Sequence, residues 1–211
     1  MANFIEKIIT KNNNEVQLFS VEPCYYEKTL LVIGMIHGDE PEGEYIAEKM
    51  MQLPHKKNRV LYIPCLNPDG KALKTRTNAN GVDLNRNFPS CNWVLSDKNR
   101  YFGGEKPLSE IESIFLEKTI KKYTPYAILT LHTPFEIVNF DGDAIDIAQN
   151  MSNLSGYKLE ENIGYPTPGS FGSYFGIEQK YKIITLEMTE TSDFQELWQK
   201  LKKSLEYFIN L

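Results

Sequence analysis

Residues 31–44 read LVIGMIHGDEPEGE. An almost continuous apolar run leads to His37, and the chain turns polar immediately afterwards, at Gly38. Such a run is typical of a strand that is buried on both of its faces. The chain has only three histidines, and one of them ends this strand, with Glu40 three residues later. The segment therefore predicts a buried strand that delivers polar side chains to the edge of a sheet.

Strands and helices alternate along the rest of the chain. Strands are predicted at 29–37, 58–66, 126–132 and 181–189, all nearly continuous in apolar and β-branched residues. Helical patterns are expected at 41–53, 109–123, 143–154 and 192–209. This alternation predicts an α/β fold with a mixed, mostly parallel central β-sheet covered by helices on both faces.

Two local signals are more specific. Ser109 and Glu112 have the spacing of a capping box, which predicts that a helix begins beside Ser109. Asp141 and Asp143 in the sequence FDGD at 140–143 are candidates for the substrate pocket, but this sequence favours a solvated turn. The long irregular stretches 67–108 and 164–176 are rich in Asn, Gly and Pro and are expected to be loops that carry function.

Composition excludes several classes of protein. The 211 residues are expected to form one domain, 1–211. The net charge of -5 provides no overall positive field, so nucleic acid is not an expected partner. No segment approaches the roughly 20 apolar residues of a membrane span, and the N-terminal residues lack the apolar stretch of a secretory signal. We therefore expect no membrane partner and a cytoplasmic location. The oligomeric state stays open.

Polar residues end three of the predicted strands. His37 and His132 are the last residues of two of them, and Glu187 lies close to the end of a third. In an open α/β sheet, ligands bind beyond the carboxyl ends of the strands. His37, Glu40 and His132 supply two imidazoles and one carboxylate, the donor set of a catalytic zinc site that leaves a fourth position to water. The alternative is that each histidine is a hydrogen-bonded structural residue.

The sequence RTNANGVDLNRNFP at 76–89 adds groups that bind anions. Asn85 and Arg86 place a neutral amide beside a permanently charged planar guanidinium, a combination suited to a substrate carboxylate. Arg76 could reach the same cleft. The alternative is a loop whose polar side chains satisfy its own backbone groups.

The motifs HGDE, NPDG, GVDLNRNFP, LHT and TLE together resemble those of the zinc carboxypeptidase superfamily. HGDEPEGE with GYPTPGSFGSY is similar to the murein peptide amidase branch of that superfamily. The resemblance implies the α/β/α sandwich of these enzymes, with His37, Glu40 and His132 as ligands of one zinc ion. It also implies that Glu187 is the general base, which accepts a proton from water and hands it to the leaving amine.

The same resemblance assigns roles to the loop residues. Asp83 matches an acidic residue that hydrogen-bonds a ligand histidine. Asn85 and Arg86 match the pair that binds the free carboxylate of the residue being removed. Arg76 resembles the arginine that stabilises the oxyanion, although it lies closer to GVDLNR than in the digestive carboxypeptidases. Tyr165 resembles a mobile tyrosine that contacts the substrate.

The resemblance implies a zinc-dependent amidase that cuts an amide next to a free carboxylate in a small peptide. The implied substrate is a murein tripeptide, L-Ala-γ-D-Glu-meso-diaminopimelate, cut between D-Glu and diaminopimelate during cell wall recycling. The alternatives are a deacylase of N-acyl amino acids of the aspartoacylase or succinylglutamate desuccinylase type, a broad carboxypeptidase, and a zinc-binding protein without turnover. A diaminopimelate side chain carries an amine and a carboxylate, so its pocket should pair an acidic group with basic or amide groups.

Overall fold

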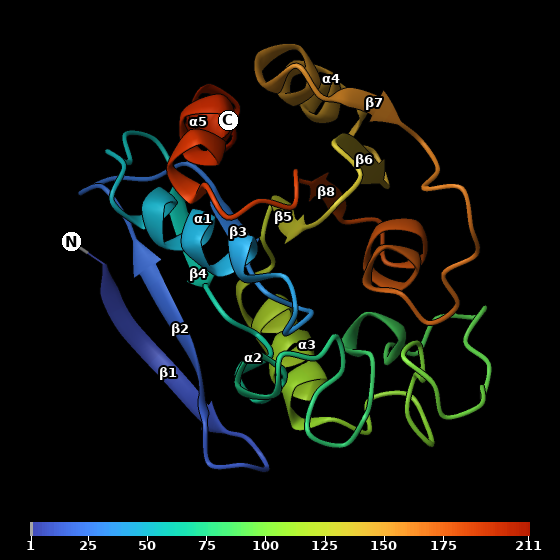
Figure 1. Ribbon diagram of the computed structural model, residues 1–211. Helices are drawn as coiled ribbons and strands as arrows, with labels where there is room; N and C mark the ends of the chain where they lie inside the picture. The colour runs from blue at the N-terminus through green and yellow to red at the C-terminus, as the bar shows by residue number, and fades with distance from the viewer. Residues whose placement is uncertain (1) are drawn as a thin grey trace.

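The computed structural model describes residues 2–211, and its centre is an eight-stranded sheet with the order β1-β2-β4-β3-β5-β8-β6-β7 (Figure 1). Strands β4, β3, β5 and β8 run parallel to one another, and β6 runs parallel to β7. The pairs β1–β2, β2–β4 and β6–β8 are antiparallel. The sheet is therefore mixed and mostly parallel, as expected. Its strands are β1 (Asn3–Ile9), β2 (Glu15–Val21), β3 (Thr29–Ile33), β4 (Arg59–Ile63), β5 (Ala127–His132), β6 (Ile137–Asp141), β7 (Lys158–Glu160) and β8 (Lys182–Glu187).

Helices cover both faces of this sheet (Figure 1). Helices α1, α4 and α5 pack on one face, and α3 packs on the other together with a π-helix at Gly172–Glu178. Within residues 2–211, no helix is at once long enough and apolar enough to cross a lipid bilayer. The helices are α1 (Pro41–Met51), α2 (Pro68–Leu73), α3 (Ile111–Tyr123), α4 (Ile145–Ser155) and α5 (Phe194–Ile209).

The central strands bury apolar side chains on both faces. Val32 of β3 belongs to the layer that contains α1 and α5, and its neighbour Leu31 belongs to the layer that contains α3. Both side chains are fully excluded from solvent. Burial of a Val or Leu side chain contributes about 1.5–3 kcal/mol. This two-sided burial explains why these strands are continuous apolar runs in the sequence.

The edges of the sheet differ from the sequence prediction. The hairpin β1–β2 and the short strands β6 and β7 were not predicted. β2 buries alternate side chains, such as Val16 and Leu18, and so has no continuous apolar run, and the side chains of β1, β6 and β7 are only partly buried. The solvated turn predicted at 140–143 is wrong at Asp141, which is the last residue of β6 and pairs with Ile183 of β8. Asp143 is exposed.

The capping box predicted for α3 does not form. The helix begins at Ile111 with Glu110 at the N-cap and no side-chain cap. The Ser109 hydroxyl donates to Glu110 Oε1 over 2.6 Å, and the Asn78 amide lies 3.4 Å from both carboxylate oxygens of Glu112. The prediction failed because a distant loop, which carries Asn78, provides the partner of Glu112.

Glu112 generates a pH-dependent stability prediction. Burial, together with the charge of Glu110, raises the pKa of Glu112 to about 7. The ordinary carboxyl pKa is 4.5, so between pH 4.5 and about 7 the folded protein holds a proton that the unfolded chain releases. Glu112 therefore destabilises the fold increasingly as the pH rises through this window. Glu112→Gln should therefore raise the free energy of unfolding by about 3 kcal/mol near pH 8 and by little near pH 4.5.

Denaturant unfolding of both proteins across this pH range measures the difference. Glu105→Gln removes the same charge from an exposed side chain and should show no such pH dependence. A difference between wild type and Glu112→Gln that stays constant with pH would contradict the assignment.

Candidate metal centre

His37 lies in the loop between β3 and α1, because β3 ends at Ile33 rather than at His37 as the sequence suggested. The loop is held tightly against α2: a Cβ atom at Gly38 would lie 2.1 Å from the carbonyl carbon of Gly70. Only glycine allows this close approach. The backbone N–H of Glu40 donates to the carbonyl of His37 over 3.2 Å, so the turn brings both side chains to the same side.

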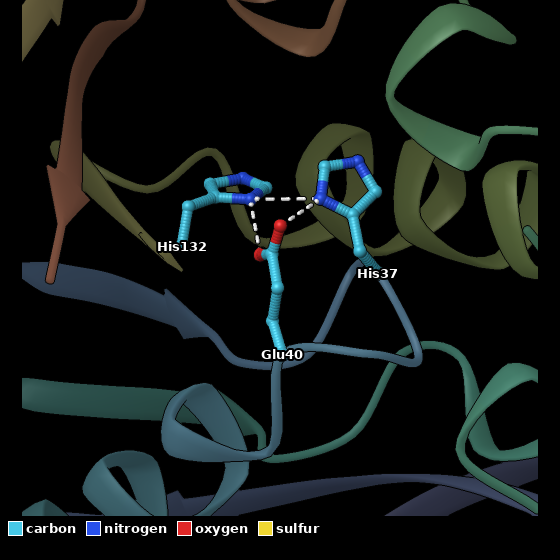
Figure 2. A group of neighbouring side chains, drawn as sticks. All are labelled: His37, Glu40 and His132. Carbon is cyan, nitrogen blue, oxygen red and sulfur yellow. Dashed lines mark hydrogen bonds and ion pairs between the residues drawn. The ribbon is translucent and has the colours of Figure 1, made fainter. Parts of the chain in front are cut away.

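His37, Glu40 and His132 point toward one another (Figure 2). Glu40 Oε1 lies 2.7 Å from His37 Nδ1, and Glu40 Oε2 lies 3.0 Å from His132 Nδ1. The two Nδ1 atoms are 3.3 Å apart. All three side chains are buried. His132 is the last residue of β5, so two segments that are distant in the sequence converge at one point.

The chemistry of this group fits zinc. His37 Nε2 lies 3.2 Å from Asp83 Oδ1, so in the neutral ring the proton belongs on Nε2 and Nδ1 presents a lone pair. Two ring nitrogens and the Glu40 carboxylate thus converge, and a proton or a metal cation must lie between them. Burial lowers the pKa of His37, but the carboxylates of Glu40 and Asp83 raise it to about 9, so a proton or a metal ion can supply that charge. Two imidazoles and one carboxylate match the donors of catalytic zinc sites.

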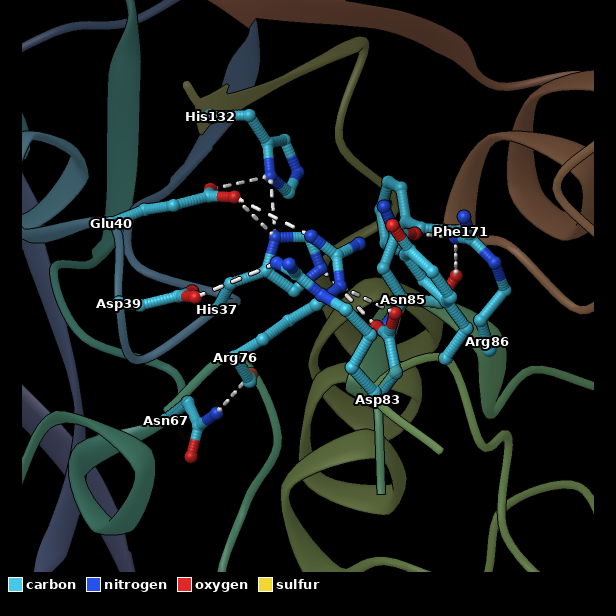
Figure 3. A network of polar contacts seen from close by, with 12 residues as sticks. His37, Asp39, Glu40, Asn67, Arg76, Asp83, Asn85, Arg86, His132 and Phe171 are labelled. Atoms are coloured by element: carbon cyan, nitrogen blue, oxygen red, sulfur yellow. Dashed lines mark hydrogen bonds and ion pairs between the residues drawn. The ribbon is translucent and has the colours of Figure 1, made fainter. Parts of the chain in front are cut away.

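Asp83 connects this group to the neighbouring loop (Figure 3). Its side chain is fully buried. Besides His37, it accepts a hydrogen bond from Arg76 Nε over 2.8 Å and one from the backbone N–H of Asn85 over 2.9 Å. Although burial raises the pKa of Asp83, His37 and Arg76 hold it well below its usual range. Asp83 is therefore an ionised carboxylate that orients both partners.

Asn85 and Arg86 lie in a 3-10 turn, Leu84–Arg86, that Asp83 caps. Asn85 Oδ1 accepts the backbone N–H of Phe171 over 2.9 Å, which leaves the amide NH₂ group as a donor for a ligand (Figure 3). Arg86 is 5% exposed and donates to the carbonyl of Asn85 over 2.7 Å. Among residues 2–211, no carboxylate forms an ion pair with its guanidinium. A buried cation without an acidic partner is suited to bind an anion.

Glu187 ends β8 directly beside His132, its registered neighbour on β5. Its side chain is buried, and within residues 2–211 its Oε2 atom finds no hydrogen-bond partner. Burial and the nearby charge of Glu40 raise the pKa of Glu187 to about 8. A carboxyl group in this environment can take up and release a proton near neutral pH.

Arg76 and Tyr165 complete the wall of the site. Arg76 Nη1 lies 3.7 Å from Glu40 Oε1, and its guanidinium lies 5.2 Å from the centre of the Tyr101 ring. Tyr165 is 44% exposed, and its ring packs edge to face with Phe135 at 6.4 Å.

The structure brings the residues selected from the sequence together around one cavity of about 340 Å³. Asp83 lies behind its wall, and the remaining residues line it: His37, Glu40, Arg76, Asn85, Arg86, His132, Tyr165 and Glu187. The cavity also contains residues that the sequence did not single out, among them Arg100, Tyr101 and Glu190. They lie on irregular segments without a motif, so no local signal marked them. The third histidine, His55, lies elsewhere and contacts the Tyr62 hydroxyl at 2.7 Å.

The chain belongs to the zinc carboxypeptidase family, whose model matches residues 9–206, and it is a hydrolase of that family. It is 31% identical over 165 residues to murein peptide amidase A of Escherichia coli K12, and the aligned region covers 72% of this chain and 68% of that protein. The protein of the same name from Vibrio campbellii is 28% identical over 194 residues, covering 86% of this chain and 76% of that one. The crystal structure of murein-tripeptide amidase MpaA from Escherichia coli O157 superposes with a TM-score of 0.84 at 27% identity, covering 96% of this chain and 90% of that one.

The contact between Asp83 and His37 predicts an effect on metal affinity. Asp83→Asn retains the shape of the side chain but removes the charge that holds the proton on His37 Nε2. We expect zinc affinity to fall about 10- to 100-fold, measured by competition with a chromophoric chelator. Asp97→Asn, which removes a charge from an exposed loop, should bind zinc as the wild type does. Equal affinity of wild type and Asp83→Asn would contradict the proposed contact.

Proposed function

We propose that this protein is a zinc-dependent amidase that removes the C-terminal residue of small murein peptides, cutting L-Ala-γ-D-Glu-meso-diaminopimelate between D-Glu and diaminopimelate. One observation carries the proposal: a convergent His-Glu-His group and a buried guanidinium without an acidic partner line the same cavity. The names of the relatives support the substrate class. The proposal includes a single catalytic domain over residues 1–211, which the family match over 9–206 supports.

The size of the cavity supports the biological setting that we propose. A space of about 340 Å³ admits the end of a small peptide. A cytoplasmic location, as the sequence leads us to expect, would suit fragments released from the wall better than the intact cross-linked polymer. We therefore include cell wall recycling, in the cytoplasm, in the proposal.

The proposed ligands of one zinc ion are His37, Glu40 and His132. The ion would supply a Lewis acid that polarises the carbonyl of the scissile amide and makes water more acidic. Asp83 fixes the orientation of His37 for this task through its contact with Nε2.

Asn85 and Arg86 would bind the free carboxylate of the departing residue. The Arg86 guanidinium supplies the charge, and the Asn85 amide supplies a donor whose direction is fixed by the hydrogen bond from Phe171 to Oδ1. Held at this end, the peptide places its last amide bond beside Glu187. Binding through the carboxylate thus restricts hydrolysis to the terminal residue.

Glu187 would move the proton. Its carboxylate accepts a proton from the attacking water and returns it to the nitrogen of the departing amine, so the group is restored after each turnover. The unpartnered Oε2 atom is free for this transfer. Arg76, which Asp83 holds at the wall of the cavity, would donate to the carbonyl oxygen as negative charge develops there. Tyr165, which lines the cavity and is partly exposed, would contact the bound peptide.

Hydrolysis of a small substrate panel by the zinc-loaded protein tests the proposal. Mass spectrometry should detect diaminopimelate released from the murein tripeptide, and much slower release from N-acetylated amino acids or peptides with ordinary α-linkages. Preferential cleavage of the acylated amino acids would instead identify a deacylase, and equal cleavage of the α-linked peptides would identify a broad carboxypeptidase.

Glu187→Gln should lower kcat for the tripeptide by about 10²- to 10⁴-fold, the usual contribution of a general base, and leave the zinc content unchanged. Glu190→Gln is the matched control, because Glu190 lines the same cavity but is exposed. It should retain most of the activity. Full activity of Glu187→Gln would exclude the proposed proton transfer.

A further inference from the structure

A third arginine lines the cavity of the candidate site and has no role in the proposed reaction. Apart from the histidines, the basic side chains of this lining, within the part of the chain that the structure describes, are Arg76, Arg86 and Arg100. Arg76 is paired with Asp83, and Arg86 is the proposed partner of the terminal carboxylate. Arg100 therefore offers a positive charge that is still available to a ligand.

The guanidinium of Arg100 is held only loosely. Its carboxylate neighbour among residues 2–211 is Asp39, whose Oδ2 atom lies 3.8 Å from Arg100 Nη2, a distance longer than a hydrogen bond. The side chain of Arg100 is 62% exposed. An exposed pair at this distance contributes little to stability. A ligand carboxylate can therefore replace Asp39 and form a bidentate pair with Arg100.

Arg100 lies close to the groups that would hold the scissile carbonyl. The Tyr101 ring contacts two guanidiniums, that of Arg76 at 5.2 Å and that of Arg100 at 5.4 Å from the ring centre. Both arginines line the cavity together with His37. A group bound by Arg100 would therefore be close to the carbonyl that Arg76 is proposed to contact.

Arg100 and Arg86 face different parts of a bound peptide. Figure 3 shows Asp39, the neighbour of Arg100, and Arg86 on opposite sides of His37. With the terminal carboxylate at Arg86 and the scissile amide beside His37, the acyl part of the substrate continues toward Asp39. Arg100 therefore faces the residue whose carbonyl is attacked, and not the residue that departs.

The proposed substrate carries a negative charge in that part. In a γ-glutamyl amide the scissile carbonyl belongs to the side chain, so the α-carboxylate of the same residue stays free, a short aliphatic spacer away. The cavity would bring this carboxylate near Asp39 and Glu190, which are both exposed acidic residues. Because like charges disfavour binding, a cation must offset them. Arg100 is the basic group of the described lining that is left for this purpose.

We propose that Arg100 binds the free α-carboxylate of the γ-linked glutamyl residue and so selects acyl groups that carry a carboxylate at this spacing. The inference rests on the proposed function, because it takes the murein peptide as the substrate and Asn85 and Arg86 as the site of its terminal carboxylate. Arg100 does not touch the reacting atoms. It aligns the acyl part of the peptide, so that binding of a remote group positions the scissile amide.

The test compares two tripeptides that differ in one group. L-Ala-γ-D-Glu-meso-diaminopimelate is paired with the analogue in which the α-carboxylate of the D-Glu residue is a carboxamide. The zinc-loaded wild type should favour the carboxylate in kcat/KM by about 3- to 10-fold, the range expected for a charge pair at an exposed site. The preference should shrink in about 1 M NaCl, because salt screens exposed charges.

Three variants assign the preference to one side chain. Arg100→Gln should hydrolyse the two peptides at similar rates, with zinc content and thermal unfolding unchanged. Arg100→Lys should keep part of the preference, because it retains the charge without the planar guanidinium. Lys98→Gln is the matched control and should keep all of it, because Lys98 pairs with Glu105 at 2.9 Å and lies outside the lining of this cavity.

Two results would overturn the inference: a wild type that hydrolyses both tripeptides equally well, or an Arg100→Gln variant that loses activity on both by the same factor. If neither tripeptide is cleaved, Nα-glutaryl-L-lysine and Nα-pentanoyl-L-lysine decide, because the glutaryl group carries a carboxylate at the same spacing. A preference for the glutaryl compound that Arg100→Gln abolishes means that the murein substrate is wrong and the role of Arg100 stands. Equal cleavage of the two compounds overturns that role.

If none of these compounds is cleaved, titration calorimetry of the zinc-loaded protein with L-Ala-D-Glu and L-Ala-D-isoglutamine gives the answer. The wild type should bind L-Ala-D-Glu more tightly, and this difference must disappear in Arg100→Gln. Equal affinity of the wild type for the two dipeptides would overturn the inference.

Discussion

The site depends on one buried negative charge, the carboxylate of Asp83. It is fully excluded from solvent, and it contacts His37, Arg76 and the backbone N–H of Asn85. Such a charge is tolerated only when its partners compensate it closely, and removing one partner is strongly destabilising. The same carboxylate therefore sets the proton position on His37, holds Arg76 at the cavity and caps the turn that carries Asn85 and Arg86. The candidate metal centre and the candidate carboxylate-binding pair cannot shift independently, which gives the site a fixed spacing between them.

The sheet supplies the second constraint, because it places side chains by register. The end of β5 brings His132 beside Glu187 of β8, and β6 adds Asp141 on the same face. A slip of one residue between β8 and β6 would turn Asp141 to the opposite face. The rigid core beneath therefore fixes the positions of His132 and Glu187 relative to each other.

The sequence predicted those features that depend on short segments. Continuous apolar runs predicted β3, β4, β5 and β8, and strand ends marked His132 and Glu187. His37 lies in the group with Glu40 and His132 although β3 ends earlier, because the turn after the strand brings His37 and Glu40 to the same side. Features that depend on distant partners were missed. The pairing of β6 with β8 makes Asp141 part of a strand, whereas FDGD alone resembles a turn. In the same way, Asn78 prevents the capping box at Glu112.

The central claim is that His37, Glu40 and His132 bind one zinc ion in the cavity that contains Glu187 and Arg86. The most direct measurement is anomalous X-ray scattering from crystals of the zinc-loaded protein, recorded on both sides of the zinc absorption edge. The account predicts one anomalous peak about 2.0–2.2 Å from Nδ1 of both histidines and from a carboxylate oxygen of Glu40. A peak bound elsewhere, or no peak in protein crystallised with excess zinc, would contradict it.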